Sequence, residues 1–303
     1  MLRSVLLYLS EQKRLQNFIL RQKPARNLSR RFVAGETLDE AIAVTRELNE
    51  RDMSVTLDHL GESVENPDQA QQAADDYIAI LERLDREGVR SGISIKPTQI
   101  GLAIDRDLCR DNLRRIAEAA RRHGRFVRID MEASQYVQAT LEVFYELFDE
   151  FSNLGVVIQS YLRRSEEDTR QLAARAAPVR LCKGAYKEPE ELAFQKKSEV
   201  DDNYVRLLEI LMASRAPVAI ATHDTKMIDA ARTLIAQDSR RGAPTEFQML
   251  YGIRRDLQAQ LVEEGYKMRV YVPYGTEWYP YFMRRMAERP ANLLFVLRAL
   301  GKG

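Results

Sequence analysis

One predicted helical segment near the end of the chain carries four polar side chains at helical spacing. Tyr281, Arg284, Arg285 and Glu288 fall at i, i+3, i+4 and i+7, which places them on one helical face. Two adjacent guanidinium groups beside a tyrosine hydroxyl would suit a carboxylate, because arginine offers planar, bidentate donors. The spacing also fits an ordinary amphipathic helix in which Glu288 pairs with Arg284 or Arg285. Spacing alone leaves both interpretations open.

A second group of polar residues follows short apolar, β-branched runs along the chain. These residues are Asp58, Lys96, Asp130, Gln159, Lys183, His223, Gln248 and Tyr271. Charged side chains this close to aliphatic runs tend to be partly buried, and a buried charge needs a partner or a ligand. Each member alone also fits a rim position, but the set indicates a ligand site built from strand ends.

The histidines and cysteines give weaker signals. His59 and His223 could bind a metal with help from Asp58 or Asp224, but no H-x-x-x-H or C-x-x-C spacing supports this, and we predict no metal site. Cys182 falls inside a predicted strand, which favours a core position over a nucleophile paired with His223.

The lysines allow other chemistry. Lys96 and Lys183 at strand ends would also suit a Schiff-base aldolase, since lysines in apolar surroundings become nucleophilic, and a metal-dependent lyase is a further alternative. The cluster formed by Lys183, Lys187, Lys196 and Lys197 is either a solvated basic face or a phosphate-binding surface.

The elements that must position these residues alternate along the chain. The predicted strands are Val55–Leu57, Ile93–Ile95, Phe126–Ile129, Val156–Ile158, Val179–Cys182, Val218–Ala221, Glu246–Leu250 and Met268–Val272. The predicted helices are Ala70–Arg86, Asp107–Arg122, Gln135–Phe151, Glu166–Ala176, Glu199–Ser214, Lys226–Ser239, Arg254–Glu264 and Trp278–Leu300. Asp105 and Ser165 are candidate N-caps, and Gly88, Gly124, Gly155 and Gly265 stand where helices should stop.

This alternation predicts the fold class. Strands alternating with helices give a parallel sheet, and eight such units in about 250 residues predict an α/β fold of the (β/α)₈, TIM-like barrel type. An open doubly wound sheet is the competitor, but the chain has neither G-x-G-x-x-G nor G-x-x-x-x-G-K-[ST]. In a barrel the site lies at the carboxyl ends of the strands, and we expect the last helix to cover its mouth.

Composition excludes several classes of protein. The 303 residues include 46 Lys plus Arg against 45 Asp plus Glu, a balance that argues against a nucleic-acid partner. No run reaches the roughly 18 apolar residues of a membrane span. Two cysteines are too few for a disulfide scaffold and fit a reducing compartment, so we expect a cytoplasmic protein.

The first 50 residues differ from the rest of the chain. Residues 1–35 hold eight basic side chains and one acid, Glu11, a local charge of +7 that leaves −6 for the remainder of the total of +1. Leu2, Leu6, Leu9 and Leu15 recur at roughly helical spacing. We predict a basic helical arm over residues 1–50 and a catalytic barrel over 51–303. The arm either packs on its own domain or lies on an anionic membrane surface.

The chain from about Val55 to Phe295 resembles the proline dehydrogenase family, including the barrel domain of bifunctional proline utilisation proteins. The motifs that carry this resemblance, each at or near a strand end, are Asp58-His59-Leu60-Gly61-Glu62, Ser94-Ile95-Lys96, Ile129-Asp130-Met131-Glu132, Gln159-Ser160-Tyr161, Arg180-Leu181-Cys182-Lys183-Gly184-Ala185-Tyr186, Ala221-Thr222-His223 and Tyr271-Val272-Pro273-Tyr274-Gly275. The clearest motif lies on the last helix, from Tyr281 to Asn292.

The resemblance implies a role for each matching residue. Arg284 and Arg285 would hold the proline carboxylate, with Lys96, Leu250, Tyr271 and Tyr281 completing the pocket. Asp130 would brace Tyr271, and Glu62 would be an acidic gate that pairs with Arg284. The residues that would hold FAD, which this family binds without a Rossmann motif, are Gln159, Arg180, Cys182, Lys183, Gly184, Ala185, Tyr186, Lys197, His223 and Glu288.

The resemblance also implies an activity. Family members oxidise L-proline to 1-pyrroline-5-carboxylate by hydride transfer to FAD and pass the electrons to membrane quinone. The basic arm would then suit peripheral contact with the inner face of the cell membrane, and an oligomer is compatible with the sequence. The chain departs from the family pattern at Lys187, where an aromatic residue is common, and at Pro97-Thr98, which replaces the usual Leu-Ser.

Overall fold

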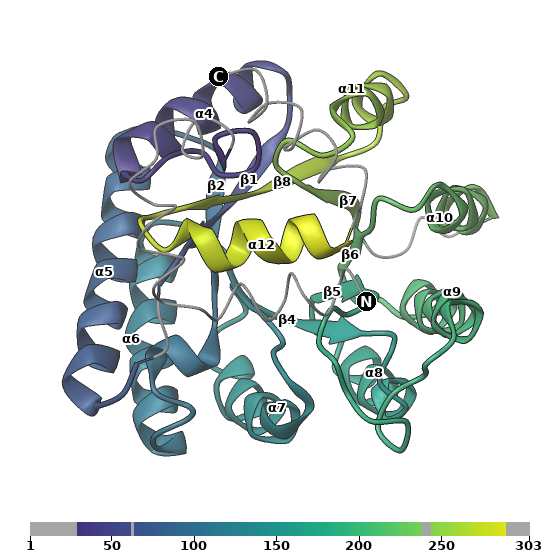
Figure 1. The fold of residues 1–303 in the computed structure, drawn as a ribbon, viewed down its shortest axis with the longest axis horizontal. Coiled ribbons are helices and arrows are strands. Elements are labelled where there is room, and N and C mark those ends of the chain that lie inside the picture. The colour runs from purple at the N-terminus through teal and green to yellow at the C-terminus, as the bar shows by residue number, and fades with distance from the viewer. Residues whose placement is uncertain (1–28, 62–63, 238–243, 289–303) are drawn as a thin grey trace.

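The predicted barrel is confirmed by a computed structural model, which describes residues 29–61, 64–237 and 244–288, the last five without their side chains. Eight parallel strands pair in chain order and close on themselves (Figure 1). They are β1 (Ser54–His59), β2 (Ser91–Ile95), β3 (Val127–Ile129), β4 (Leu154–Gln159), β5 (Val179–Cys182), β6 (Val218–Ala221), β7 (Thr245–Leu250) and β8 (Met268–Tyr274).

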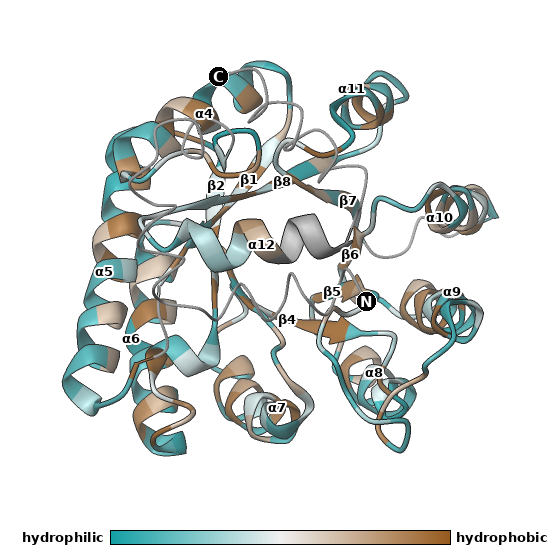
Figure 2. Ribbon diagram, in the orientation of Figure 1, coloured by the Kyte–Doolittle hydropathy of each residue, from teal (hydrophilic) through white to brown (hydrophobic). Residues whose placement is uncertain are grey.

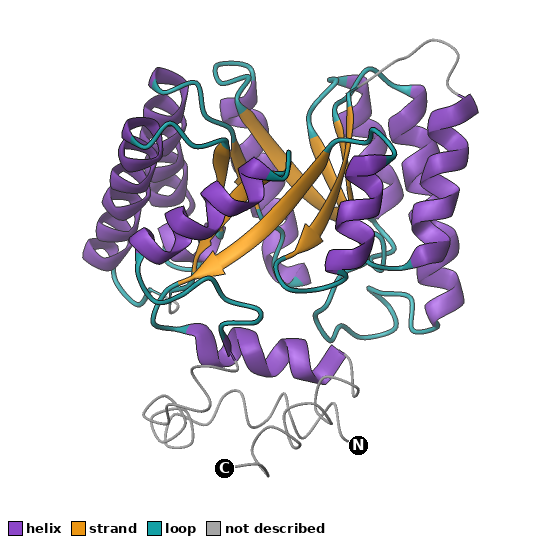
Figure 3. Cartoon of the chain, turned by 90° about the horizontal axis from the view of Figure 1, so that it is seen from above, coloured by secondary structure: helices purple, strands orange, loops and turns teal. Residues whose placement is uncertain are grey.

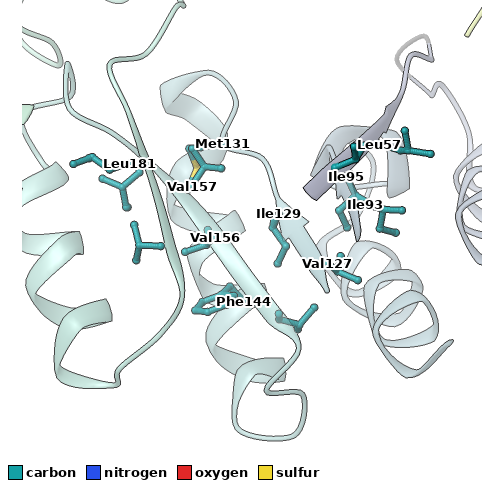
Figure 4. Packing of buried hydrophobic residues seen from close by; sticks show 14 of the residues in the cluster. Leu57, Ile93, Ile95, Val127, Ile129, Met131, Phe144, Val156, Val157 and Leu181 are labelled. Atoms are coloured by element: carbon teal, nitrogen blue, oxygen red, sulfur yellow. The ribbon is translucent and has the colours of Figure 1, made fainter. Parts of the chain in front are cut away.

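Alternation along the strands separates an apolar layer from a polar interior. Residues such as Val55, Leu57, Ile93 and Ile95 belong to the buried core between strands and helices. Figure 4 shows one sector of this layer, which includes Val127, Ile129 and Val156 of the strands and Phe144 of a neighbouring helix. The residues between these positions face the inside of the barrel, where many are polar or charged.

Helices surround the strands, with apolar faces toward the barrel and polar faces outward (Figure 2). They are α5 (Pro67–Arg86), α6 (Arg106–Arg122), α7 (Ser134–Phe148), α8 (Ser165–Ala174), α9 (Lys197–Ala213), α10 (Thr225–Gln237) and α11 (Arg255–Glu263). A short 3₁₀ helix, η1 (Pro97–Ile100), which the sequence pattern did not predict, follows β2.

Most of the predicted helix boundaries lie within three residues of the observed ones. Asp105 caps α6 as predicted, because its carboxylate accepts a hydrogen bond from the Leu108 backbone N–H at 2.8 Å. Two details were wrong. Ser165 is the first residue of α8, and its hydroxyl donates to the Gln159 carbonyl. Gly155 lies within β4, where a Cβ atom would come within 2.6 Å of the Arg128 Nη1.

Two helices depart from a simple alternating barrel. Helix α4 (Leu38–Glu50) packs beside β1 and β8, in the position that a helix after β8 would otherwise fill. Helix α12 (Trp278–Glu288) instead crosses the face formed by the carboxyl ends of the strands (Figures 1 and 3). Trp278 anchors it, because the buried indole donates to Glu36 and its ring contacts Phe282. The domain boundary at residue 50 stays a prediction, and residues 1–28 and 289–303 lie outside the described residues.

Candidate active site

A cavity of about 540 Å³ opens at the carboxyl ends of the strands, on the side that α12 crosses. Its volume falls within the usual range for small-molecule sites. The predicted site residues that line it are Lys96, Asp130, Gln159, Arg180, Cys182, Lys183, Gly184, Ala185, Tyr186, Lys197, His223, Leu250 and Tyr271. Strand ends scattered over 176 positions of sequence, from Lys96 to Tyr271, therefore meet in one place.

Asp130, directly after β3, is the hub of the cavity floor. Its Oδ1 accepts hydrogen bonds from Ser94 and from the Arg180 Nη1, both at 2.7 Å. Its Oδ2 accepts from the Tyr271 hydroxyl at 2.9 Å, which is the contact expected from the resemblance. The Arg180 guanidinium also lies 5.3 Å from the Tyr271 ring centroid and donates to Gln248 at 2.6 Å. One carboxylate thus orients side chains from β2, β5 and β8.

Tyr271 stays protonated in this setting. Burial, reinforced by the negative charge of Asp130, raises the pKa of Tyr271 well above its ordinary value. The phenol is therefore a hydrogen-bond donor to Asp130 at neutral pH.

Lys96 is an ammonium held by a buried carboxylate. Its Nζ lies 2.6 Å from the Asp58 Oδ1, and the Asp58 side chain is 1% exposed. Burial alone would lower the pKa of Lys96, but the charges of Asp58 and Asp130 outweigh it and raise the pKa. A Schiff-base nucleophile needs the opposite shift, so this environment argues against the aldolase alternative.

Glu132 is a cavity residue to which the sequence analysis gave no role. Its carboxylate accepts from the Thr98 backbone N–H at 3.0 Å and from the Thr98 hydroxyl at 2.7 Å. Burial raises the pKa of Glu132 despite these two bonds. The available signal was its place in the Ile129–Glu132 motif, two residues after Asp130 on the same strand end.

Two lysines of the predicted basic cluster, Lys183 and Lys197, line the cavity and form ion pairs with carboxylates. Lys183 lies between Asp201 and Asp224, and Lys197 contacts the same two carboxylates. Burial would raise the pKa of Asp224, but hydrogen bonds from Lys183 and Lys197 lower it well below its usual range. Asp201 was missed because it lies on α9, away from any strand end.

Gly184 occupies a position that only glycine suits. Its φ is +98°, and a Cβ atom there would lie 2.1 Å from the Tyr161 ring. The backbone after β5 therefore closes tightly on Tyr161, while Ala185 and Tyr186 are exposed at the cavity.

Cysteine and histidine chemistry receives no support from the geometry. Burial raises the pKa of the Cys182 thiol to about 12, so it is not a nucleophile at neutral pH. The His223 Nε2 accepts a hydrogen bond from the Leu250 backbone at 2.9 Å, and His59 stacks on Tyr274. Within the described ranges, no three His, Cys, Asp or Glu side chains are grouped as metal ligands would be.

The remaining predicted residues lie on α12 or outside the described part. Tyr281 is buried on α12. Arg284, Arg285 and Glu288 belong to the same helix, but their side chains lie outside the description, as does Glu62 entirely. The helix that carries the proposed carboxylate clamp is thus in place over the cavity.

The fold and cavity define a TIM-type barrel with a charged small-molecule site at the carboxyl ends of its strands, covered by a crossing helix. The comparisons with known proteins are specific. A family model described as Proline dehydrogenase matches residues 41–298. The chain is 40% identical over 302 residues to Proline dehydrogenase 1 of Bacillus subtilis (strain 168), covering 100% of both chains. It is 42% identical over 282 residues to Proline dehydrogenase of Deinococcus radiodurans, covering 91% of each.

A solved structure agrees with these matches. Proline utilization A (PutA) from Bdellovibrio bacteriovorus, inactivated by N-propargylglycine, superimposes with a TM-score of 0.81 at 29% identity. The match covers 87% of this chain and 33% of that one. The chain belongs to the proline dehydrogenase family.

Proposed function

We propose that this protein is an FAD-dependent proline dehydrogenase that oxidises L-proline to 1-pyrroline-5-carboxylate. The observation that carries the proposal is the convergence of Lys96, Asp130, Arg180 and Tyr271, which lie in or directly after four different strands, in one cavity beneath α12. Family membership supports the reaction class, and the ammonium state of Lys96 argues against the competing aldolase chemistry.

The cavity residues fit a flavin. Gln159 is 3% exposed, and its Oε1 has no hydrogen-bond partner among the described residues, so an acceptor faces the cavity for a ligand N–H. Gln159, Arg180 and His223 would hold the ring system, and Lys183 and Lys197 would hold the diphosphate. FAD, when bound, would supply the hydride acceptor for oxidation at the carbon beside the substrate ring nitrogen.

The protein would hold proline by its carboxylate. Arg284 and Arg285, one turn or less from Tyr281 on α12, are the proposed bidentate donors. Lys96 and Tyr271 would contact the substrate from the barrel side, with Leu250 packing against the ring. The same cations would keep the substrate nitrogen unprotonated, because positive neighbours lower an ammonium pKa. Glu62 would gate entry by pairing with Arg284.

A product assay tests the proposed reaction. The purified protein, given L-proline and a soluble quinone analogue, should form 1-pyrroline-5-carboxylate, which o-aminobenzaldehyde converts to a coloured adduct. D-proline is the matched control, because this enantiomer has the same chemical groups in the opposite configuration. No adduct from L-proline, together with a borohydride-trapped carbonyl adduct on Lys96, would reject the proposal in favour of the aldolase.

We further propose that electrons pass to membrane quinone while the protein works at the cytoplasmic face of the membrane. None of the helices in the described part of the chain combines the length and apolar character that crossing a bilayer requires. The local charge of +7 in residues 1–35 supports transient attraction to anionic lipid.

Co-sedimentation with liposomes tests the membrane contact. Intact protein should pellet with vesicles of anionic lipid and less with neutral vesicles, and the fraction bound should fall at high salt. A variant lacking residues 1–28 should pellet less on the anionic vesicles. Equal pelleting of the two proteins would show that residues 1–28 do not contribute to membrane binding.

A further inference from the structure

A second cavity, of about 350 Å³, is lined by residues at the amino ends of the strands. These strand ends lie on the face opposite α12 (Figure 3). Its rim includes the prolines that directly precede β5, β6 and β7, namely Pro178, Pro217 and Pro244. This end of a TIM barrel normally serves stability rather than catalysis. Here, however, the wall is strongly basic, and its charged residues are Arg128, Arg180, Glu246, Lys267 and Arg269.

Two of the guanidinium groups are neutralised by carboxylates. The Arg269 Nε lies 2.8 Å from a Glu246 oxygen, and the Arg180 Nη1 lies 2.7 Å from Asp130. Arg128 has no ion-pair partner in the described part of the chain. Its hydrogen bonds there come from Nη1, to the carbonyl oxygens of Val156 at 3.0 Å and Pro178 at 2.8 Å. This network therefore holds three guanidinium groups against two carboxylates, and the Arg269–Glu246 pair within it is partly exposed.

The Arg128 side chain is buried in the barrel interior. The residue is 5% exposed, and its guanidinium lies 4.9 Å from the Phe126 ring centroid. Gly155 on β4 gives it room, since a Cβ atom there would come within 2.6 Å of Nη1. Its Nε is buried and has no hydrogen-bond partner among the described residues. This buried donor beside the cavity needs an acceptor that the described residues do not supply.

The charge of Arg128 cannot be removed by losing a proton. Burial and the neighbouring charges of Arg180 and Arg269 lower the pKa of Arg128, but an arginine guanidinium stays protonated in proteins. An uncompensated buried cation is costly, and the nearby Arg180 adds repulsion. Lys267 at the rim is exposed, so solvent screens its charge. The excess is therefore one positive charge among Arg128, Arg180, Arg269, Asp130 and Glu246.

We propose that the amino-end cavity binds a small monovalent inorganic anion of the chloride type, held by Arg128 with Arg180 as its second cation. One negative charge matches the one unpaired guanidinium, and the Nε of Arg128 supplies an unused donor. A divalent phosphate would carry one negative charge more than the unpaired guanidinium neutralises. The site is separate from the proposed substrate cavity, with which it shares Arg180 and Gln248 as a common wall.

Bromide provides a direct probe, because it replaces chloride and scatters X-rays anomalously. Crystals of the full-length holoenzyme soaked in bromide should show an anomalous peak within hydrogen-bonding distance of the Arg128 guanidinium. A crystal that diffracts well and shows no peak in the amino-end cavity would overturn the proposal.

Thermal unfolding tests whether the anion belongs to the folded protein in solution. Sodium chloride should replace sodium gluconate at constant ionic strength, since gluconate is a much larger, organic anion and chloride is the anion under test. Above the dissociation constant, each tenfold rise in chloride should lower the unfolding equilibrium constant about tenfold. A peak in the crystal with no chloride dependence would mean an adventitious ion only, and stabilisation by phosphate but not chloride would also contradict the proposal.

Two variants identify the residue responsible. Arg128→Met keeps an unbranched side chain but removes the guanidinium group, and it should abolish the chloride dependence. Lys267→Met removes a rim charge of the same sign and should retain it. Equal chloride dependence in both variants would refute the assignment to Arg128. If Arg128→Met does not fold, the bromide peak in the unaltered protein still decides.

Discussion

Replacement of Asp130 by Asn removes the negative charge that accepts hydrogen bonds from Ser94, Arg180 and Tyr271. The amide can still accept from Ser94, but it cannot neutralise Arg180, whose side chain is 7% exposed. The Tyr271 hydroxyl loses its anionic acceptor at the same time. Asp130→Asn is nearly isosteric, so the change should alter charge and hydrogen bonding rather than volume.

The loss of unfolding free energy expected for Asp130→Asn depends on how deeply the Asp130–Arg180 ion pair is buried. Breaking a fully buried ion pair by removing one partner costs about 3–5 kcal/mol. Asp130 is 16% exposed, and Arg180 keeps its bond to Gln248, so we expect the lower end, about 3 kcal/mol. That is roughly a hundredfold change in the unfolding equilibrium constant. Tyr271→Phe leaves the ion pair intact and should cost only about 1.5 kcal/mol, the value of one hydrogen bond to a charged group.

Urea denaturation of the two single variants and the double variant measures these costs. The Asp130–Tyr271 coupling energy from the cycle should be about 1 kcal/mol. In steady-state assays, Asp130→Asn should lower kcat/KM for L-proline at least about tenfold, because Tyr271 is no longer held toward the substrate. If the unfolding free energy of Asp130→Asn stays within about 0.5 kcal/mol of that of the parent protein and kcat/KM is unchanged, Asp130 does not orient the neighbouring side chains.

Four further predictions concern other parts of the site. Arg285→Met should raise the KM for L-proline at least tenfold, since a charge-assisted bidentate contact contributes about 1.5–3 kcal/mol, and an unchanged KM would remove Arg285 from the clamp. Gly184→Ala should lower stability and cofactor retention by more than Gly265→Ala, because both have positive φ but only Gly184 has a side chain within 4 Å of the added Cβ; equal losses of stability would exclude the steric clash. The lowered pKa of Asp224 means that its contribution to stability is present above the unfolded-state pKa and is lost as pH falls toward the folded-state pKa. Unfolding free energies of Asp224→Asn should therefore fall less steeply than those of the parent protein below about pH 5, and parallel curves would contradict this. Glu132, whose pKa is raised, should act with the opposite sign, so Glu132→Gln should gain stability relative to the parent as pH rises through the unfolded-state pKa of Glu132.

The barrel was predictable because its signals are local and repeated. Runs such as Val156–Ile158 and helices such as Asp107–Arg122 show their periods within a few residues, and the order of elements then restricts the topology. The carboxyl ends of parallel strands in a barrel share one face, so the sequence alone predicts that Asp130 and Tyr271 lie on the same face of the barrel.

The missed features depend on tertiary contacts that have no sequence period. Asp201 reaches Lys183 only because α9 packs against β5. Glu132 receives its hydrogen bonds from Thr98 of the 3₁₀ helix η1. Gly155 looked like a helix stop because its true function, making room for Arg128, involves a residue 27 positions earlier. The unpaired charge of Arg128 is likewise visible only when the interior of the barrel is assembled.

The most direct test of the central claim is an anaerobic spectrum of the purified protein before and after addition of L-proline. We expect a yellow protein whose flavin absorbance bleaches with L-proline, is unaffected by D-proline, and bleaches far more slowly in Arg285→Met. A colourless protein that cannot be reconstituted with FAD, or a bound flavin that L-proline leaves oxidised, would contradict the claim that the cavity beneath α12 is the site of proline oxidation.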